Sequence, residues 1–279
     1  MKIGLVLEGG AMRGMFTAGV LDVMMENNIA VDTVVGVSAG ALFGVNFLSR
    51  QIGRVIRYNK RFNGAKGYMG LRPLLREGNV VSTEFAYERV PRELDPFDDE
   101  TYKTSTIPFY AVVANVKTGE AEYKRIHSVF EQMDTLRASG SMPFVSKPVE
   151  IGDEAYLDGA IADSIPFEWA LSAGCEKLIV VLTRDEGYIK KPMPNILIRR
   201  YKKKYPKIAE KLFTQHIRYH EALDRLKALE AEGKALVIRP SKPIEIGRIE
   251  KDPDKLQAVY DLGVSDGTEK LAALKAFLE

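Results

Sequence analysis

The chain has 279 residues, of which 46% are hydrophobic and 28% are charged. This composition is typical of a soluble globular protein that can bury a sizeable core, and it argues against an intrinsically disordered chain. The formal net charge of +2 favours neither nucleic acid nor an acidic partner, and the single cysteine, Cys175, excludes an intramolecular disulfide. We expect Cys175 to be a small core residue rather than a nucleophile.

The sequence predicts no targeting or membrane-spanning segment. The apolar run after Lys2 ends at Glu8, which is too short for a signal peptide. The longest uncharged run, residues 33–49, is interrupted by glycine and serine, so we interpret it as a strand, a turn and a helix. We therefore expect a cytoplasmic protein with at most peripheral membrane contact.

The first fifty residues predict two strand–turn–helix units. Residues 2–7 and 31–37 are apolar and rich in β-forming residues, while residues 15–28 and 39–50 have apolar positions at helical spacing. Parallel strands need such helical crossovers. The fold class we predict is therefore α/β, with a mostly parallel central sheet flanked by helices on both faces.

The following residues continue this pattern after an irregular insertion. Residues 51–106 are mixed and charged, and we expect helices and irregular segments here that cover the active face. Ser128 and Glu131 form a capping-box pattern, which predicts that a helix begins at Ser128. The predicted elements are strands at 109–116, 120–126, 155–158 and 176–183, and helices at 128–139 and 166–174.

The composition changes after Thr183. Nine Lys or Arg residues and one acid lie between Lys190 and Lys211. We expect a long amphipathic helix over 206–232 and a strand at 235–240. Two further helices should follow, separated at Gly263, with Asp252 capping the first and Ser265 or Asp266 capping the second. We place a boundary near residue 184, between a catalytic domain (3–183) and a basic, mostly helical C-terminal region (184–279).

Ser38 lies between a predicted strand and a predicted helix, in the pattern Gly36-x-Ser38-x-Gly40. A serine in such a corner can adopt a strained conformation with its hydroxyl group clear of the backbone. The positive end of the following helix favours a developing oxyanion. We predict that Ser38 is a nucleophile, with a plain tight turn as the alternative.

A second glycine-rich loop, Glu8–Gly14, follows the first strand. Its backbone N–H groups could line a cavity for an anion, and we expect an oxyanion cradle beside Ser38. The alternative is a dinucleotide-binding fingerprint. Ala11 replaces the glycine that a pyrophosphate would need, and the expected acid about twenty residues further on is absent.

A serine nucleophile needs a base. The three histidines, His127, His216 and His220, show no metal-binding or triad pattern, although a Ser–His–Asp order ending in His216 or His220 remains open. Asp158 ends a predicted strand, and its carboxylate could take the serine proton directly if it lay in a desolvated pocket.

Four blocks of sequence occur in a characteristic order: "GGAMRG", "GVSAG", "RASGSMP" (137–143) and "DGA" (158–160). Together they resemble the patatin-like phospholipase family, and specifically its bacterial members, over about residues 3–183. This resemblance implies a three-layer α/β/α fold and a lipid acyl hydrolase with a serine–aspartate dyad that needs neither a cofactor nor a metal.

The resemblance assigns roles to individual residues. Ser38 would be the nucleophile and Asp158, followed by Gly159 and Ala160, the proton acceptor. Ser139 and Ser141 would support the pocket. The sequence departs from the family pattern at Ala11 and Ala160, where glycine is usual. The oxyanion hole would be formed by Gly9, Gly10, Ala11, Met12, Arg13 and Gly14.

Several questions stay open at the level of sequence. The same fold could form a non-catalytic lipid-binding module, and the basic stretch 190–211 could be a solvated connector or a surface drawn to anionic headgroups. Nothing indicates a nucleic-acid-binding module. The acyl chain, the headgroup and the oligomeric state are left undetermined.

Overall fold

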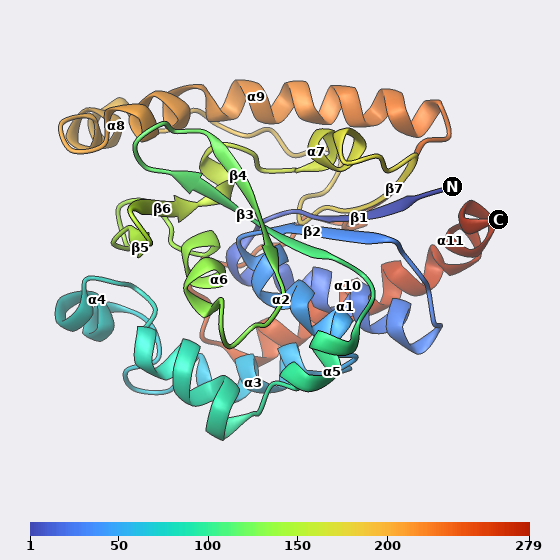
Figure 1. Cartoon of the computed structure of the whole chain (residues 1–279), viewed down its shortest axis with the longest axis horizontal. Helices are drawn as coiled ribbons and strands as arrows, with labels where there is room; N and C mark the ends of the chain where they lie inside the picture. The colour runs from blue at the N-terminus through green and yellow to red at the C-terminus, as the bar shows by residue number, and fades with distance from the viewer.

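The computed structural model describes the backbone of residues 1–279 and every side chain except that of Arg200. Its centre is one eight-stranded sheet (Figure 1). The strands are β1 (Ile3–Leu7), β2 (Thr33–Val37), β3 (Phe109–Asn115), β4 (Ala121–Ile126), β5 (Val149–Ile151), β6 (Glu154–Asp158), β7 (Lys177–Val181) and β8 (Ala235–Ile238).

The strand order is β5-β6-β3-β2-β1-β7-β8, and β4 also pairs with β3. β3, β2, β1, β7 and β8 run parallel to one another, whereas β4 and β6 are antiparallel to β3 and β5 is antiparallel to β6. The α/β class and the mostly parallel sheet predicted from the sequence are confirmed.

Helices cover both faces of the sheet. In Figure 1, α7 and α9 lie above the sheet, while α1, α2, α3 and α10 lie below it. The helices are α1 (Gly14–Glu26), α2 (Ala39–Leu48), α3 (Arg54–Phe62), α4 (Leu71–Glu77), α5 (Asp99–Thr104), α6 (Met133–Ser139), α7 (Phe167–Ser172), α8 (Asn195–Lys202), α9 (Pro206–Ala231), α10 (Pro253–Glu269) and α11 (Leu271–Leu278). A π-helical segment, Glu84–Leu94, precedes α5.

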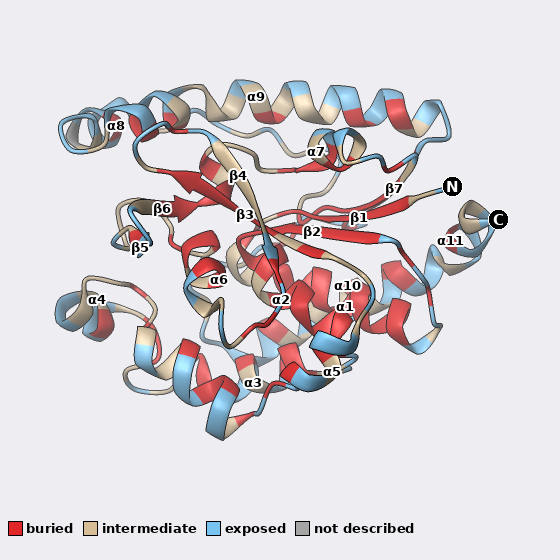
Figure 2. Ribbon diagram, viewed as in Figure 1, coloured by how far each residue is buried: buried red, intermediate tan, exposed pale blue. Residues whose placement is uncertain are grey.

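The central strands are apolar on both faces because each face packs against helices. Leu5 and Leu7 of β1 belong to the core between the sheet and helices α1 and α2. Val6 points to the other face and belongs to the core between the sheet and helices α7 and α9. Figure 2 shows these strands buried and the outer surface of α9 partly exposed. In the described residues, no helix is long and apolar enough to cross a membrane.

Two helices follow Asp252 as predicted, but they are separated at Lys270, so the predicted separation at Gly263 is wrong. α10 runs through this glycine to Glu269, and Asp266 lies inside it, where its carboxylate accepts hydrogen bonds from Ser241. A Cβ at Gly263 would lie 2.1 Å from the Phe16 carbonyl oxygen of α1. The glycine therefore allows two helices to cross closely and does not end one. The predicted cap at Asp252 is confirmed.

The predicted helix start at Ser128 is also wrong, because residues 129–132 form turns and α6 begins at Met133. The Ser128 hydroxyl does accept the Glu131 N–H, as in a capping box. The side chain that returns the hydrogen bond is that of Gln132, which accepts the N–H groups of His127 and Ser128.

The C-terminal residues complete the same sheet and core. β8 pairs with β7, and α10 packs along α1. A domain boundary near residue 184 stays a prediction, although in space the two regions share one sheet.

Candidate active site

Ser38 lies at the sharp corner between β2 and α2. Its backbone angles are φ 56° and ψ −123°, a conformation that costs free energy for a residue with a side chain. Gly36 and Gly40 are needed because the chain is crowded here. A Cβ at Gly40 would lie 2.4 Å from the Leu7 carbonyl oxygen, and one at Gly36 would lie 2.5 Å from that of Gly40. The corner therefore holds the hydroxyl group away from its own strand and helix.

The Ser38 hydroxyl donates a hydrogen bond of 2.7 Å to the Asp158 carboxylate. Asp158 ends β6, which is separated from β2 in the sheet by β3. Its second carboxylate oxygen accepts the Ala160 N–H at 2.9 Å. The carboxylate is thus fixed on both oxygens, with one directed at the serine.

Burial raises the pKa of Asp158 to about 6, because the charged form is desolvated. The hydrogen bonds from Ser38 and Ala160 and the positive charges of Arg248 and Lys190 lower the pKa and oppose this effect. At neutral pH the group is therefore mostly ionised yet close to its titration range, which suits a general base.

The segment 137–143 holds both partners in place. The Ser139 hydroxyl accepts the Ser38 N–H at 2.9 Å and donates to the Val112 carbonyl at 2.7 Å. The Ser141 carbonyl accepts the Asp158 N–H at 2.9 Å. Ser139 therefore fixes the backbone of Ser38, and Ser141 fixes the backbone of Asp158.

The glycine-rich loop passes directly beside Ser38. A Cβ at Gly9 would lie 2.9 Å from the Ser38 Cβ, and one at Gly10 would lie 2.6 Å from the Thr183 hydroxyl. The N–H groups of Gly9, Gly10 and Ala11 donate to no acceptor in the part of the chain that the structure describes. These donors are free to bind an oxyanion.

The remaining members of the predicted oxyanion set lie differently. The Arg13 N–H donates to the Gly10 carbonyl, and Gly14 begins α1 and packs against Ala39. Met12 lines the apolar side of the site. The structure therefore brings the loop to Ser38 mainly through Gly9, Gly10 and Ala11.

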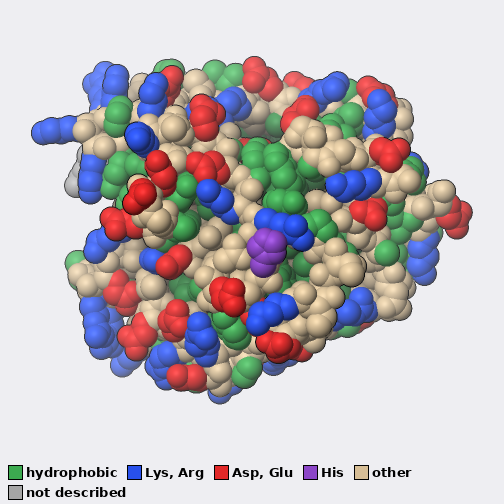
Figure 3. All heavy atoms as spheres, viewed as in Figure 1, with side chains coloured by type: hydrophobic (Ala, Val, Ile, Leu, Met, Phe, Trp, Pro, Cys, Tyr) green, Lys and Arg blue, Asp and Glu red, His purple; other side chains and the backbone are tan. Residues whose placement is uncertain are grey.

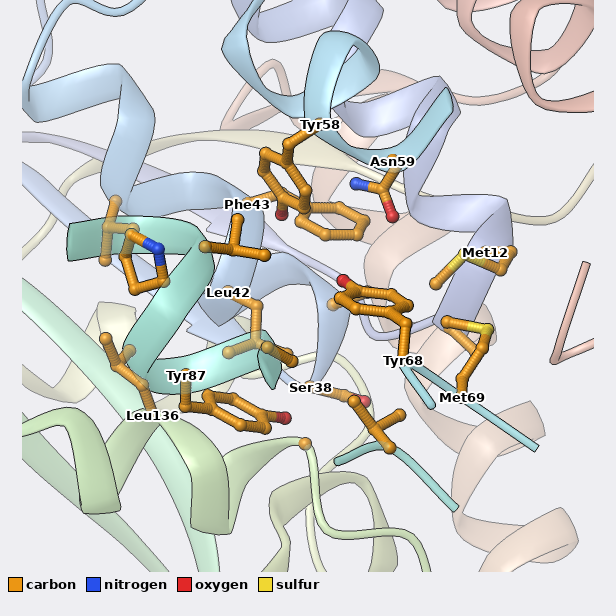
Figure 4. A pocket seen from close by; sticks show the side chains of 18 of the residues that line it. Met12, Ser38, Leu42, Phe43, Tyr58, Asn59, Tyr68, Met69, Tyr87 and Leu136 are labelled. Carbon is orange, nitrogen blue, oxygen red and sulfur yellow. The ribbon is translucent and has the colours of Figure 1, made fainter. Parts of the chain in front are cut away.

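Two cavities meet at Ser38. One, of about 130 Å³, has mostly apolar walls from α2, the π-helical segment and residues 58–69 (Figure 4). The other, of about 110 Å³, contains Asp158 and three cationic side chains, Arg13, Lys190 and Arg248. Burial and the nearby cations lower the pKa of Lys190 to about 8. Ser38 thus lies between an apolar and a cationic space.

The histidines lie elsewhere. His127 is exposed, His216 has a buried Nδ1 that lacks a partner among the described residues, and His220 contacts the Lys190 carbonyl. Cys175 is buried and packs against Gly4. In the described residues, no group of three or more His, Cys, Asp or Glu side chains could hold a metal ion.

Sequence reasoning missed the cationic side of the site. The sequence marks Lys190 only as part of the basic stretch 190–211, and Arg248 lies in a segment without a recognisable motif. It also missed Glu8, whose buried carboxylate accepts hydrogen bonds from Thr183 and Tyr219 and ties β1 to α9. The signal that could have revealed this role is an acidic residue, Glu8, directly after a strand that is predicted to be buried.

The two alanines that stand where the family usually has glycine differ in conformation. Replacing each by glycine should therefore change the free energy of unfolding in opposite directions. Ala11 has φ 48°, whereas Ala160 lies in a short right-handed helix, Gly159–Ile161. We expect Ala11→Gly to raise the free energy of unfolding by about 1 kcal/mol, because it removes left-handed strain. Ala160→Gly, the matched control, should lower it by about 0.5–1 kcal/mol. Urea unfolding measures both, and effects of the same sign would contradict this reading.

Two family models and a solved structure match parts of the chain or its fold. The family model for patatin-like phospholipase matches residues 5–171, and one described as a domain of unknown function (DUF6363) matches residues 205–279. Among solved structures, VipD from Legionella pneumophila gives a TM-score of 0.49 at 12% identity, covering 98% of this chain and 67% of that one.

Curated relatives include both bacterial and eukaryotic proteins. An uncharacterized Escherichia coli protein, YjjU, is 30% identical over 65% of this chain and 52% of its own length. Lysophospholipase nte1 of Aspergillus niger is 25% identical over 98% of this chain and 18% of its own length. Neuropathy target esterase sws of Drosophila melanogaster is 27% identical over 64% of this chain and 13% of its own length. The chain thus spans about half of the first relative and less than a fifth of the others. Because the patatin model matches more than half of the sequence, the chain belongs to the patatin-like phospholipase family.

Proposed function

We propose that the protein is a lipid acyl hydrolase in which Ser38 attacks the ester carbonyl and Asp158 accepts its proton. The observation that carries this proposal is the 2.7 Å hydrogen bond between the Ser38 hydroxyl and the Asp158 carboxylate at a strained strand–helix corner. The family and its relatives named lysophospholipase and esterase support an activity on lipid esters.

The reaction has two half-reactions. Ser38 Oγ bonds to the carbonyl carbon as its proton passes to Asp158, and the N–H groups of Gly9, Gly10 and Ala11 bind the oxyanion. The tetrahedral intermediate expels the alcohol, which takes the proton from Asp158. Water then attacks the acyl-enzyme with Asp158 again as the base, releasing the fatty acid and restoring Ser38.

The two cavities beside Ser38 divide the substrate. The apolar cavity suits the acyl chain. The cationic cavity suits a leaving alcohol that bears a negative charge, because three cationic side chains, Arg13, Lys190 and Arg248, line it beside a single carboxylate. This arrangement supports a phosphate-bearing lipid over a neutral one as the preferred ester.

The basic stretch 190–211 is proposed to contact an anionic membrane surface. It includes α8, where Ile196 is 77% and Leu197 is 40% exposed among basic side chains. Figure 3 shows Lys and Arg side chains gathered at the corner of the molecule over α8, at the upper left. Apolar side chains within a basic surface are typical of interfacial binding. The expected cytoplasmic location stays a prediction.

Substitution of the two proposed partners should abolish turnover. We expect Ser38→Ala to lose both ester hydrolysis and labelling by a fluorophosphonate probe. Asp158→Asn should lower kcat/KM by a factor of about 10⁴, as for other catalytic units of this kind. Asp153→Asn, an exposed neighbour in the turn before β6, is the matched control and should keep full activity. Labelling that persists in Ser38→Ala would exclude the nucleophile, and an inert wild type would favour a non-catalytic lipid-binding module.

The pH dependence follows from the raised pKa of Asp158. On a neutral ester, kcat/KM should rise about tenfold per pH unit below pH 6 and level off above it, because only the ionised carboxylate is a base. Ionising this buried group also costs stability as the pH rises from about 4 to 6. Asp158→Asn should therefore gain about 1–3 kcal/mol at pH 8 and nothing below pH 4. A flat activity profile between pH 5 and 7 would contradict this account.

Membrane contact can be tested by sedimentation with vesicles. The wild type should bind vesicles of phosphatidylglycerol and phosphatidylcholine, and not pure phosphatidylcholine, since the charges select the anionic lipid. Ile196→Glu should weaken binding tenfold or more, because about 2 kcal/mol of apolar burial is lost. Ile52→Glu changes an exposed isoleucine outside this surface, and this variant should bind the vesicles as tightly as the wild type does. Equal binding by both variants would refute the contact.

A further inference from the structure

The apolar cavity beside Ser38 is not uniformly apolar. Most of its walls are aliphatic or aromatic carbon, but Tyr58, Tyr68, Tyr87 and Asn59 also line it. Figure 4 shows the three tyrosine hydroxyls and the Asn59 amide turned toward the interior, around the space that leads from Ser38. A cavity built only for a saturated chain would gain nothing from these groups.

Asn59 has a fixed orientation and an unused acceptor. Its side chain is fully buried on α3, and its Nδ2 donates to the Val55 carbonyl at 2.9 Å. This hydrogen bond determines which amide atom faces the cavity. The Oδ1 atom is buried and has no donor among the described residues. A buried acceptor without a donor costs about 1–3 kcal/mol.

Tyr68 and Tyr87 also differ from the other buried tyrosines of this chain. Tyr102 donates to the Ile126 carbonyl, and Tyr219 donates to the Glu8 carboxylate. In the described part of the chain, no side chain or backbone group forms a hydrogen bond with the hydroxyls of Tyr68 or Tyr87, whereas the Tyr58 hydroxyl has the Asn59 side chain as a hydrogen-bonding neighbour. Burial raises the pKa of Tyr58, Tyr68 and Tyr87, that of Tyr58 to about 12, so they remain neutral donors and acceptors.

This cavity has two cationic side chains, of which one is paired and the other lies where the two cavities meet. Arg54 lines one wall, but its guanidinium pairs with the Asp95 carboxylate at 3.4 Å and donates to the Asn46 side chain at 3.0 Å. Arg248 lines both cavities, as Ser38 does, so a ligand carboxylate away from this junction would find no unpaired cation and would face the Asn59 Oδ1. The unused groups instead match a neutral hydroxyl, which can donate to Asn59 and accept from a tyrosine.

We propose that this cavity binds an acyl chain that carries a hydroxyl group, so that the protein prefers hydroxyacyl esters over the corresponding plain esters. This inference rests on the proposed function, because it concerns the acyl group of the same ester. A plain chain would leave the Tyr68 and Tyr87 hydroxyls and the Asn59 Oδ1 without partners, whereas a hydroxyacyl chain supplies one. Sites built around a substrate hydroxyl discriminate strongly against analogues that lack it.

The test compares p-nitrophenyl esters of one chain length, plain or with a hydroxyl at successive carbons. At the best position, the wild type should show a kcat/KM at least tenfold higher than for the plain ester. Tyr68→Phe and Asn59→Leu should each lower this ratio about tenfold. Tyr102→Phe removes a buried hydroxyl outside the cavity and should leave the ratio unchanged. Tyr87→Phe serves as a second tyrosine variant if Tyr68→Phe does not fold.

Binding to the Ser38→Ala variant separates this inference from the proposed reaction. Calorimetry with a hydroxy fatty acid and its plain counterpart should show tighter binding of the former, even if neither ester is hydrolysed. Hydrolysis without preference for any hydroxyl position, or a preference that Tyr68→Phe and Asn59→Leu leave intact, overturns the inference and leaves the reaction standing. Absence of turnover with selective binding overturns the reaction alone.

Discussion

The structure depends on a hydrogen bond between two residues 120 positions apart, the Ser38 hydroxyl and the Asp158 carboxylate. They can meet because β2 and β6 flank β3 in one sheet, where Val37, next to Ser38, pairs with Val112 and Asp158 pairs with Val113. The free energy needed to hold Ser38 in a left-handed corner and Asp158 away from water is supplied by the packed sheet around them. The site is therefore preorganised by the fold and does not rely on a flexible loop.

The C-terminal residues are part of this arrangement. β8 extends the sheet beside β7, and the packing of α10 on α1 requires glycine at the crossing. Lys190 and Arg248, both beyond the segment matched by the patatin model, line the cationic cavity. In the proposed reaction the family motifs would supply the reacting groups, while the following region would contribute to the space where the leaving group lies.

Much of the fold was predictable because apolar periodicity and glycine turns act locally. Every strand except β5, the long helix α9 and the corner at Ser38 follow from patterns of a few residues. β5 was not predicted, because its three residues are too few to show a pattern. Gly263 was misinterpreted because a helix-crossing glycine and a helix-ending glycine look alike until the partner helix is known. The roles of Lys190, Arg248 and Asn59 could not be predicted, since each depends on contacts between segments distant in sequence. Asp158 could be named as a candidate base from its place at a strand end, and the family resemblance then assigned it the role.

The most direct test of the account is a double-mutant cycle on kcat/KM with Ser38→Ala, Asp158→Asn and the double variant. If the hydroxyl and the carboxylate act as one unit, the double variant loses no more activity than the more severe single variant. Losses that multiply, or an Asp158→Asn enzyme with substantial activity, would show that the two groups act independently and would contradict the account.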